Sequence, residues 1–149
     1  FAELCTMASE EKIPTIVDCN DDVFLAPASM IEAIQEYCEQ KGLEVPRSAG
    51  QIAAVIYNSL AKCYGDTIKE LESITGKTYK SISSVGGGSN AEYLNQLTAR
   101  YTGRPVYAGP GEATAIGNLL AQMMYDGTFE DLKSAREAVY RSFEIKKYE

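Results

Sequence analysis

The sequence contains no histidine, and this absence removes much of the usual catalytic chemistry. A Ser-His-Asp triad, an HExxH metalloprotease motif, a histidine-ligated metal and a histidine general base are all excluded within these 149 residues. Any chemistry that this chain performs must therefore use carboxylates, Lys, Tyr, Cys, Ser or a bound metal.

Long apolar runs are also absent. No stretch approaches the roughly 20 apolar residues of a transmembrane helix, and no basic segment followed by an apolar one indicates a secretory signal. We therefore expect a cytoplasmic protein with no membrane partner. Hydrophobic residues make up 45% of the chain and charged residues 23%, which is typical of a single globular domain with a sizeable core.

The chain has no run of lysine or arginine, and its formal charge is −7. This charge disfavours binding to a phosphate backbone, so we expect no nucleic-acid partner.

The cysteines are far apart and form no CxxC pair, which indicates neither a zinc site nor a disulfide framework. We predict reduced, mostly buried thiols at all four positions: Cys5, Cys19, Cys38 and Cys63.

The pattern of apolar residues predicts the secondary structure. Periodic apolar residues predict one helix that Ser29 caps and Gly42 ends, and further helices over residues 1–8, 51–75, 91–101, 113–125 and 129–143. β-Branched runs predict strands over 13–19, 78–85 and 103–108, with a short extended piece at 23–26. The last residues are expected to fray. Because the chain opens without methionine and with the pattern of the middle of a helix, we expect a piece of a longer protein.

From residue 78 onward the predicted order is strand, glycine turn, helix, repeated once. This alternation is typical of an α/β domain with parallel strands, in which ligands bind at the carboxyl ends of the strands. The first turn contains Gly86, Gly87 and Gly88 in succession. Since a glycine in a packed element costs about 0.5–1 kcal/mol relative to alanine, three together indicate a positive φ, a close backbone approach or a ligand.

Two known phosphate loops do not fit these glycines. A Walker A motif ending at Lys77 needs a glycine where Leu71 stands, and a dinucleotide-binding loop needs an acidic residue about 20 residues later, where the second strand is neutral. Two interpretations remain. The turn lies against an adenosine or its phosphates, with Ser89 or Asn90 capping the next helix, or the glycines only allow a helix to pack tightly on the sheet.

Two stretches together resemble a known family. IVDCNDDVFLAPASM, and further along VGGGSNAEYLNQLTARYTGRPVYAGPGEATAIGNLLAQ, are similar to the C-terminal part of rhamnulokinases, a group of FGGY carbohydrate kinases. The resemblance runs from Ile16 to Met124. It implies an α/β fold with a ribonuclease H-like core and a sheet flanked by helices, as in the C-terminal domain of actin- and hexokinase-like ATPases. Residues 1–149 are then expected to form most of the nucleotide-binding C-terminal domain, without the start of that domain or the N-terminal domain.

The resemblance also implies a site and a reaction. The nucleotide-binding turn matches Gly86, Gly87, Gly88, Ser89 and Asn90, with Gly87 the strongest candidate. The family uses ATP and Mg²⁺ to phosphorylate a sugar, here the 1-hydroxyl of L-rhamnulose, which a preceding domain holds. Because the family's catalytic aspartate also lies in that domain, we expect no catalytic residue and no metal ligand in this chain. Rhamnulokinases usually carry Asn where this chain has Ala91, so a side-chain contact with adenine is not implied there.

Alternatives stay open for both the site and the function. Asp18, Asp21 and Asp22 are neighbouring carboxylates of the kind that hold Mg²⁺ or accept a proton, but NDD is also a common turn and cap signal. Another FGGY kinase, acting on L-fuculose, a pentulose or an autoinducer sugar, is one alternative function. A catalytically silent actin-like interaction module is the other. The oligomeric state is open.

Overall fold

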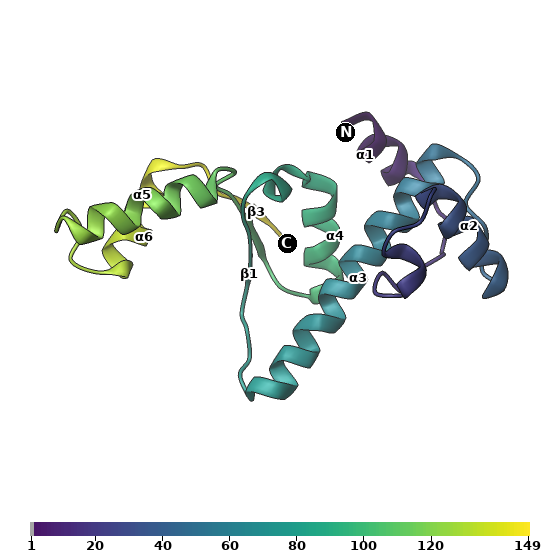
Figure 1. The fold of residues 1–149 in the computed structure, drawn as a ribbon, viewed down its shortest axis with the longest axis horizontal. Helices are drawn as coiled ribbons and strands as arrows, with labels where there is room; N and C mark the ends of the chain where they lie inside the picture. The colour runs from purple at the N-terminus through teal and green to yellow at the C-terminus, as the bar shows by residue number, and fades with distance from the viewer. Residues whose placement is uncertain (1) are drawn as a thin grey trace. The chain divides into compact units, whose positions relative to one another are not determined.

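The computed structural model describes residues 2–149, with Ala2 described by its backbone alone, and it divides into two compact units (Figure 1). Unit 1 is the chain up to Thr78 together with Arg100–Thr102, and unit 2 comprises Tyr79–Ala99 and Gly103–Glu149. The first residue of the predicted helix 1–8 lies outside the described residues.

Unit 1 is helical, and local signals in the sequence set the ends of its helices. Its elements are α1 (Ala2–Glu10), the 3₁₀ helix η1 (Asp22–Phe24), α2 (Met30–Gln40) and α3 (Ala49–Thr75). Ser29 caps α2 as predicted, by accepting a hydrogen bond from the N–H of Glu32. The helix α3 begins with a capping box between Ser48 and Gln51 and ends at Gly76, whose φ of 66° places it in the left-handed region.

The core of unit 1 is built on α2, α3 and the segment that precedes η1. It consists of buried apolar side chains at Val17, Ile34, Cys38, Ile52 and Val55. The helix α1 packs along α3 (Figure 1), and Gly50 permits this close approach. A Cβ atom at Gly50 would lie 2.9 Å from Oε1 of Glu11 and 3.3 Å from Cβ of Met7.

The strand predicted over residues 13–19 is wrong. The segment is not part of any sheet among residues 2–149, although Thr15 and Val17 are buried in strand-like alternation. The backbone of this segment bonds to a side chain instead of to a neighbouring strand. The N–H of Val17 donates to Oγ of Ser59 at 3.0 Å. The extended piece predicted at 23–26 is also wrong, since Asp21 caps the 3₁₀ helix η1 there.

Unit 2 contains a small sheet with helices beside it (Figure 1). Its elements are β1 (Ile82–Ser84), η2 (Gly87–Asn90), α4 (Glu92–Thr102, whose last three residues belong to unit 1), β2 (Val106–Ala108), α5 (Ala113–Tyr125), α6 (Leu132–Ser142) and β3 (Lys146–Tyr148). The strands β1 and β2 run parallel, with Ile82 opposite Val106 and Ser84 opposite Ala108. This pairing confirms the predicted parallel arrangement.

The expectation that the last residues fray is wrong. They form β3, which pairs antiparallel with the second edge of β2 and places Lys146 opposite Ala108. Val106 and Ala108 are buried, and a buried strand needs hydrogen-bond partners on both edges. The short tail supplies these partners, which makes β2 the central strand of the sheet.

The helices α5 and α6 lie side by side in unit 2 (Figure 1). The bounds of α5 are those predicted from its apolar pattern, yet none of its residues is buried. Among the helices of residues 2–149, none is both long and apolar enough to cross a membrane.

Candidate functional site

Two glycine turns meet at the carboxyl ends of the parallel strands in unit 2. The first follows β1 and contains Gly86–Gly88, and the second follows β2 and begins at Gly109. The N–H of Gly86 donates to the carbonyl of Pro110 at 3.0 Å, and the N–H of Gly109 donates to the carbonyl of Ser84 at 2.9 Å. The sheet therefore brings the two turns into direct contact at the edge where open α/β sheets bind ligands.

The three consecutive glycines do not have the same conformation. Gly86 has a φ of 75°, so its backbone alone requires glycine. Gly87 and Gly88 have no positive φ, and a Cβ atom at either position would meet nothing within 4 Å. Both are exposed. Neither a positive φ nor close packing within the described chain explains why Gly87 and Gly88 are glycines.

The backbone of this turn also leaves donors available. The N–H groups of Ser89 and Ala91 donate to the carbonyls of Gly86 and Gly88, at 3.0 and 3.1 Å. Within the described part of the chain, the N–H groups of Gly87 and Gly88 have no acceptor. Two exposed amides without side chains beside them are suited to binding an anion such as a phosphate.

Ser89 and Asn90 do not cap the following helix, so this prediction is wrong. The N-cap of α4 is Ala91, which makes no side-chain capping bond, because the 3₁₀ turn η2 comes between the glycines and the helix. Ser89 is 6% exposed, and its hydroxyl donates to the carbonyl of Gly86 at 2.7 Å. The structure thus places Ser89 inside the turn as a support, while Asn90 is exposed.

Asn95 is a supporting residue that sequence reasoning missed. It is 3% exposed, and its Nδ2 donates to the carbonyl of Ser89 at 2.9 Å. This hydrogen bond connects the glycine turn to the helix α4. No sequence signal distinguishes Asn95 from an ordinary polar residue on a helix surface.

A cavity of about 270 Å³ lies beside the two turns, within unit 2. Nine residues from the two turns, α4, β2 and the C-terminal segment line it: Ser89, Asn90, Glu92, Ala108, Gly109, Gly111, Glu144, Lys146 and Tyr148. Nζ of Lys146 lies 2.6 Å from Oε1 of Glu92. This hydrogen bond, together with the charge of the carboxylate, raises the pKa of the Lys146 ammonium. Sequence reasoning missed Lys146 and Tyr148, because it expected the tail to fray.

Asp18 and Asp21 act as turn and cap residues in unit 1. Oδ1 of Asp18 accepts a hydrogen bond from the N–H of Asn20 at 3.0 Å, and Oδ1 of Asp21 accepts one from the N–H of Val23 at 3.1 Å. These bonds confirm the turn and cap interpretation for both residues. No group of three or more Cys, Asp or Glu side chains among residues 2–149 is placed to hold a metal ion.

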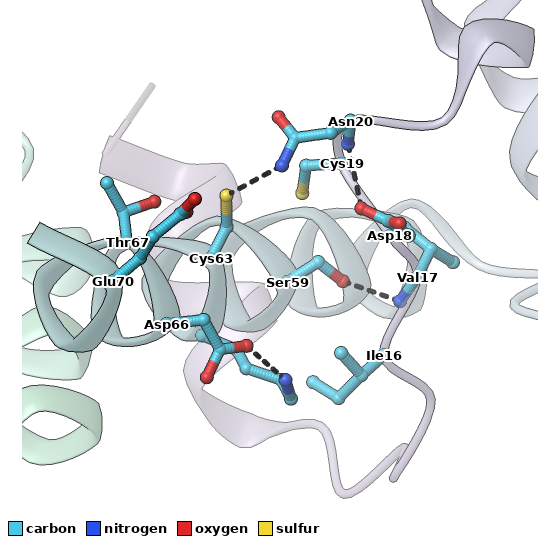
Figure 2. Close-up of a pocket in the computed structure, with 11 residues that line it drawn as sticks. Ile16, Val17, Asp18, Cys19, Asn20, Ser59, Cys63, Asp66, Thr67 and Glu70 are labelled. Atoms are coloured by element: carbon cyan, nitrogen blue, oxygen red, sulfur yellow. Dashed lines mark hydrogen bonds and ion pairs between the residues drawn. The ribbon is translucent and has the colours of Figure 1, made fainter. Parts of the chain in front are cut away.

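A second cavity, of about 500 Å³, separates the segment 16–20 from α3 (Figure 2). Figure 2 shows the amide of Asn20 pointing at the thiol of Cys63, and its Nδ2 lies 3.5 Å from that Sγ. Cys19 lines the same cavity, and burial, the neighbouring Cys63 and Asp18 together raise the pKa of its thiol. All four cysteines are free, but only Cys38 is buried, so the prediction of mostly buried thiols is wrong.

Comparisons with known proteins agree with the resemblance noted in the sequence. The family model "FGGY family of carbohydrate kinases, C-terminal domain" matches residues 2–125. The rhamnulokinase of Bacillus subtilis is 46% identical over 98% of this chain and 30% of the relative. The rhamnulokinase of Halalkalibacterium halodurans is 44% identical over 99% of this chain and 32% of the relative. The rhamnulokinase of Bacteroides thetaiotaomicron is 40% identical over 99% of this chain and 31% of the relative. The chain thus spans less than a third of the length of these relatives.

The matched domain confirms the predicted fold class, an actin-like ATPase fold with a small sheet flanked by helices. The match covers well over half of the chain, and it includes β1, both glycine turns and α5. From its sequence, its fold and these matches, the chain belongs to the FGGY family of carbohydrate kinases.

Proposed function

We propose that residues 1–149 are the nucleotide-binding C-terminal domain of a cytoplasmic, ATP-dependent sugar kinase. The whole enzyme transfers the γ-phosphoryl group of ATP to the 1-hydroxyl of L-rhamnulose. Membership of the carbohydrate kinase family supports the reaction class, and rhamnulokinase relatives at 40–46% identity support the sugar. In this proposal the rest of the enzyme holds the sugar and supplies the aspartate that deprotonates it.

The observation that carries the nucleotide role is the pair Gly87 and Gly88. Nothing within the described chain requires glycine there, since φ is not positive and a Cβ atom would point into open space. Glycine nevertheless carries an entropic cost relative to alanine. A ligand that lies flat on the backbone gives the missing reason, because any side chain would separate it from the two exposed N–H groups.

The residues of the turn have different roles in this proposal. Gly87 and Gly88 present their N–H groups to the phosphates, and Gly86 forms the bend that exposes them. Ser89 holds the bend by its hydrogen bond to Gly86, and the exposed Asn90 borders the ligand. In the whole enzyme, Mg²⁺ bound to the ATP phosphates would neutralise charge on the transferred phosphoryl group.

The first test is the substitution Gly87→Val in the full-length kinase. We expect KM for ATP to rise about tenfold or more while KM for the sugar changes little, since the new side chain occupies only the nucleotide surface. Steady-state kinetics with each substrate varied in turn measures both constants. The matched control is Gly117→Ala, on an exposed face of α5, where a Cβ also meets nothing. Equal effects on both substrates, or none, would remove the nucleotide role from this turn.

The second test is the choice of sugar. ATP-dependent release of ADP is measured with L-rhamnulose, L-fuculose, L-ribulose, D-xylulose and glycerol. Preference for L-rhamnulose supports the proposed substrate, and preference for another sugar replaces it while keeping the kinase assignment. Silence on all five, with an intact ADP-binding site, would favour a non-catalytic actin-like module.

A further inference from the structure

Two free thiols that lie far apart in the sequence share one cavity in unit 1. Cys19 precedes the 3₁₀ helix η1, Cys63 lies on α3, and both line the cavity of about 500 Å³ (Figure 2). Both side chains are partly exposed, so neither belongs to the apolar core. The glycine turns belong to unit 2, and the proposed nucleotide role therefore gives these two thiols no task.

Two hydrogen bonds hold the segment that carries Cys19 against the face of α3 that carries Cys63. The N–H of Val17 donates to Oγ of Ser59 at 3.0 Å. Nδ2 of Asn20 donates to Sγ of Cys63 at 3.5 Å. Because Ser59 and Cys63 are four residues apart on a helix, they lie on the same face, one turn from each other. Cys19 stands between the two bonded residues of its segment, so the fold keeps it beside Cys63, as a disulfide bond between neighbouring backbone segments requires.

The two thiols also affect each other electrostatically. Burial is the largest cause of the raised pKa of the Cys19 thiol, and the charge of the neighbouring Cys63 is the next. Two thiolates in this cavity therefore repel each other. A disulfide bond carries no charge, so its formation removes this repulsion.

The cavity admits a small reagent to the two sulfur atoms, and its wall selects the charge of that reagent. The volume lies within the range of about 300–1,000 Å³ that is typical of ligand pockets. Asp18, Asp66 and Glu70 contribute carboxylates to the wall. Lys62 is the one cation among the described residues that line it, and it is paired with Asp66. The wall thus has an excess of negative charge, which attracts cationic reagents and repels anionic ones.

We propose that Cys19 and Cys63 form a redox-active pair, which small cationic disulfides such as cystamine oxidise to a reversible disulfide bond between α3 and the segment before η1. One thiolate attacks the reagent, releases one aminothiol and becomes a mixed disulfide. The other thiolate then attacks the protein sulfur of this mixed disulfide and releases the second aminothiol. The two cysteines lose two electrons and two protons, and the reagent takes up both as two aminothiols.

The test exposes the reduced, full-length kinase to cystamine, blocks the remaining thiols and identifies the products by peptide mass spectrometry. We expect a bond between the peptides of Cys19 and Cys63, and we expect dithiothreitol to break it. Cys19→Ser and Cys63→Ser should each stop at the mixed disulfide and retain one aminothiol. The matched control is Cys5→Ser, because Cys5 is a partly exposed cysteine on α1, and this variant should form the bond like the wild type.

A second measurement tests the selection by charge. Dithiodipropionate is a disulfide of similar size to cystamine but with anionic ends. Each rate is divided by the rate of the same reagent with the urea-unfolded chain, which corrects for intrinsic reactivity. Cystamine should then react about tenfold faster than dithiodipropionate at low salt, and the ratio should fall toward one as salt is added.

Two results would overturn the inference. One is a native kinase in which cystamine produces no bond between Cys19 and Cys63, or in which either cysteine pairs with another cysteine instead. The other is an equal corrected rate for both reagents at low salt, which would show that the carboxylates of the wall do not select cations. Neither result bears on the nucleotide role of the glycine turn, because the two sites share no residue.

Discussion

At the scale of single residues, the same kind of side chain has different properties at different places in the chain. Cys38 is buried in the core of unit 1, whereas Cys19 is half-buried beside the second cavity. Burial disfavours the thiolate of Cys19, and the nearby Cys63 and Asp18 add like charge that disfavours it further. The pKa of this thiol is therefore raised.

Alkylation of Cys19 tests this description. Because only the thiolate reacts, a raised pKa means slower alkylation at a given pH and a pH profile displaced to higher values than in the unfolded chain. Cys63→Ser removes one of the causes, so the profile of Cys19 should move back toward lower pH. Iodoacetamide labelling followed by peptide mass spectrometry measures the rate at each pH. An unchanged profile in Cys63→Ser would show that the two thiols do not interact.

At the scale of elements, local interactions at the ends of a helix determine where it begins and ends. The long helix α3 begins at a capping box, and Oγ of Ser48 also donates to Oε1 of Glu11 at 3.1 Å. One side chain thus satisfies a free N–H of α3 and contacts the residue that follows α1. The other end of α3 stops at Gly76 in the left-handed conformation.

Ser48→Ala is expected to destabilise unit 1 by about 1 kcal/mol, the usual cost of losing an N-cap side chain. Urea unfolding followed by circular dichroism measures the change in the free energy of unfolding. Ser142→Ala, at the exposed end of α6, is the matched control and should stay within about 0.5 kcal/mol of the wild type. Equal stability of the two variants would mean that the capping box contributes nothing measurable to α3.

At the scale of the whole molecule, the last strand completes a sheet whose other strands lie far earlier in the chain. The strand β3 pairs with β2 and supplies both Lys146 and Tyr148 to the cavity wall. Unit 1 has a core of its own, formed without any residue of β3. The two units therefore depend on different parts of the sequence.

Deletion of residues 144–149 should affect the two units unequally. We expect the amides of β2 to exchange faster with solvent, since β3 covers one of its edges, while the amides of α3 keep their protection. Hydrogen exchange read by mass spectrometry resolves the two regions. Equal loss of protection in α3 would show that unit 1 does not hold its structure without the tail.

Much of the helical structure could be predicted from the sequence. The predicted bounds of α5 agree with the structure, Ser29 caps α2, and Gly76 ends α3. These features depend on neighbours within a few residues, such as a cap, a left-handed glycine or an apolar face. The family was also recognisable, because its motifs are short segments in a fixed order.

Only the tertiary structure decided the features that depend on distant partners. Residues 13–19 have the composition of a strand but bind side chains such as Ser59 instead, and the charged tail pairs with β2. The role of each glycine in the candidate site also depends on distant residues. The sequence by itself determined that three glycines stand in a row after a strand, whereas the structure showed that only Gly86 needs glycine for its backbone. Strand pairing and the surroundings of a glycine arise from residues far apart in sequence, so local patterns do not encode them.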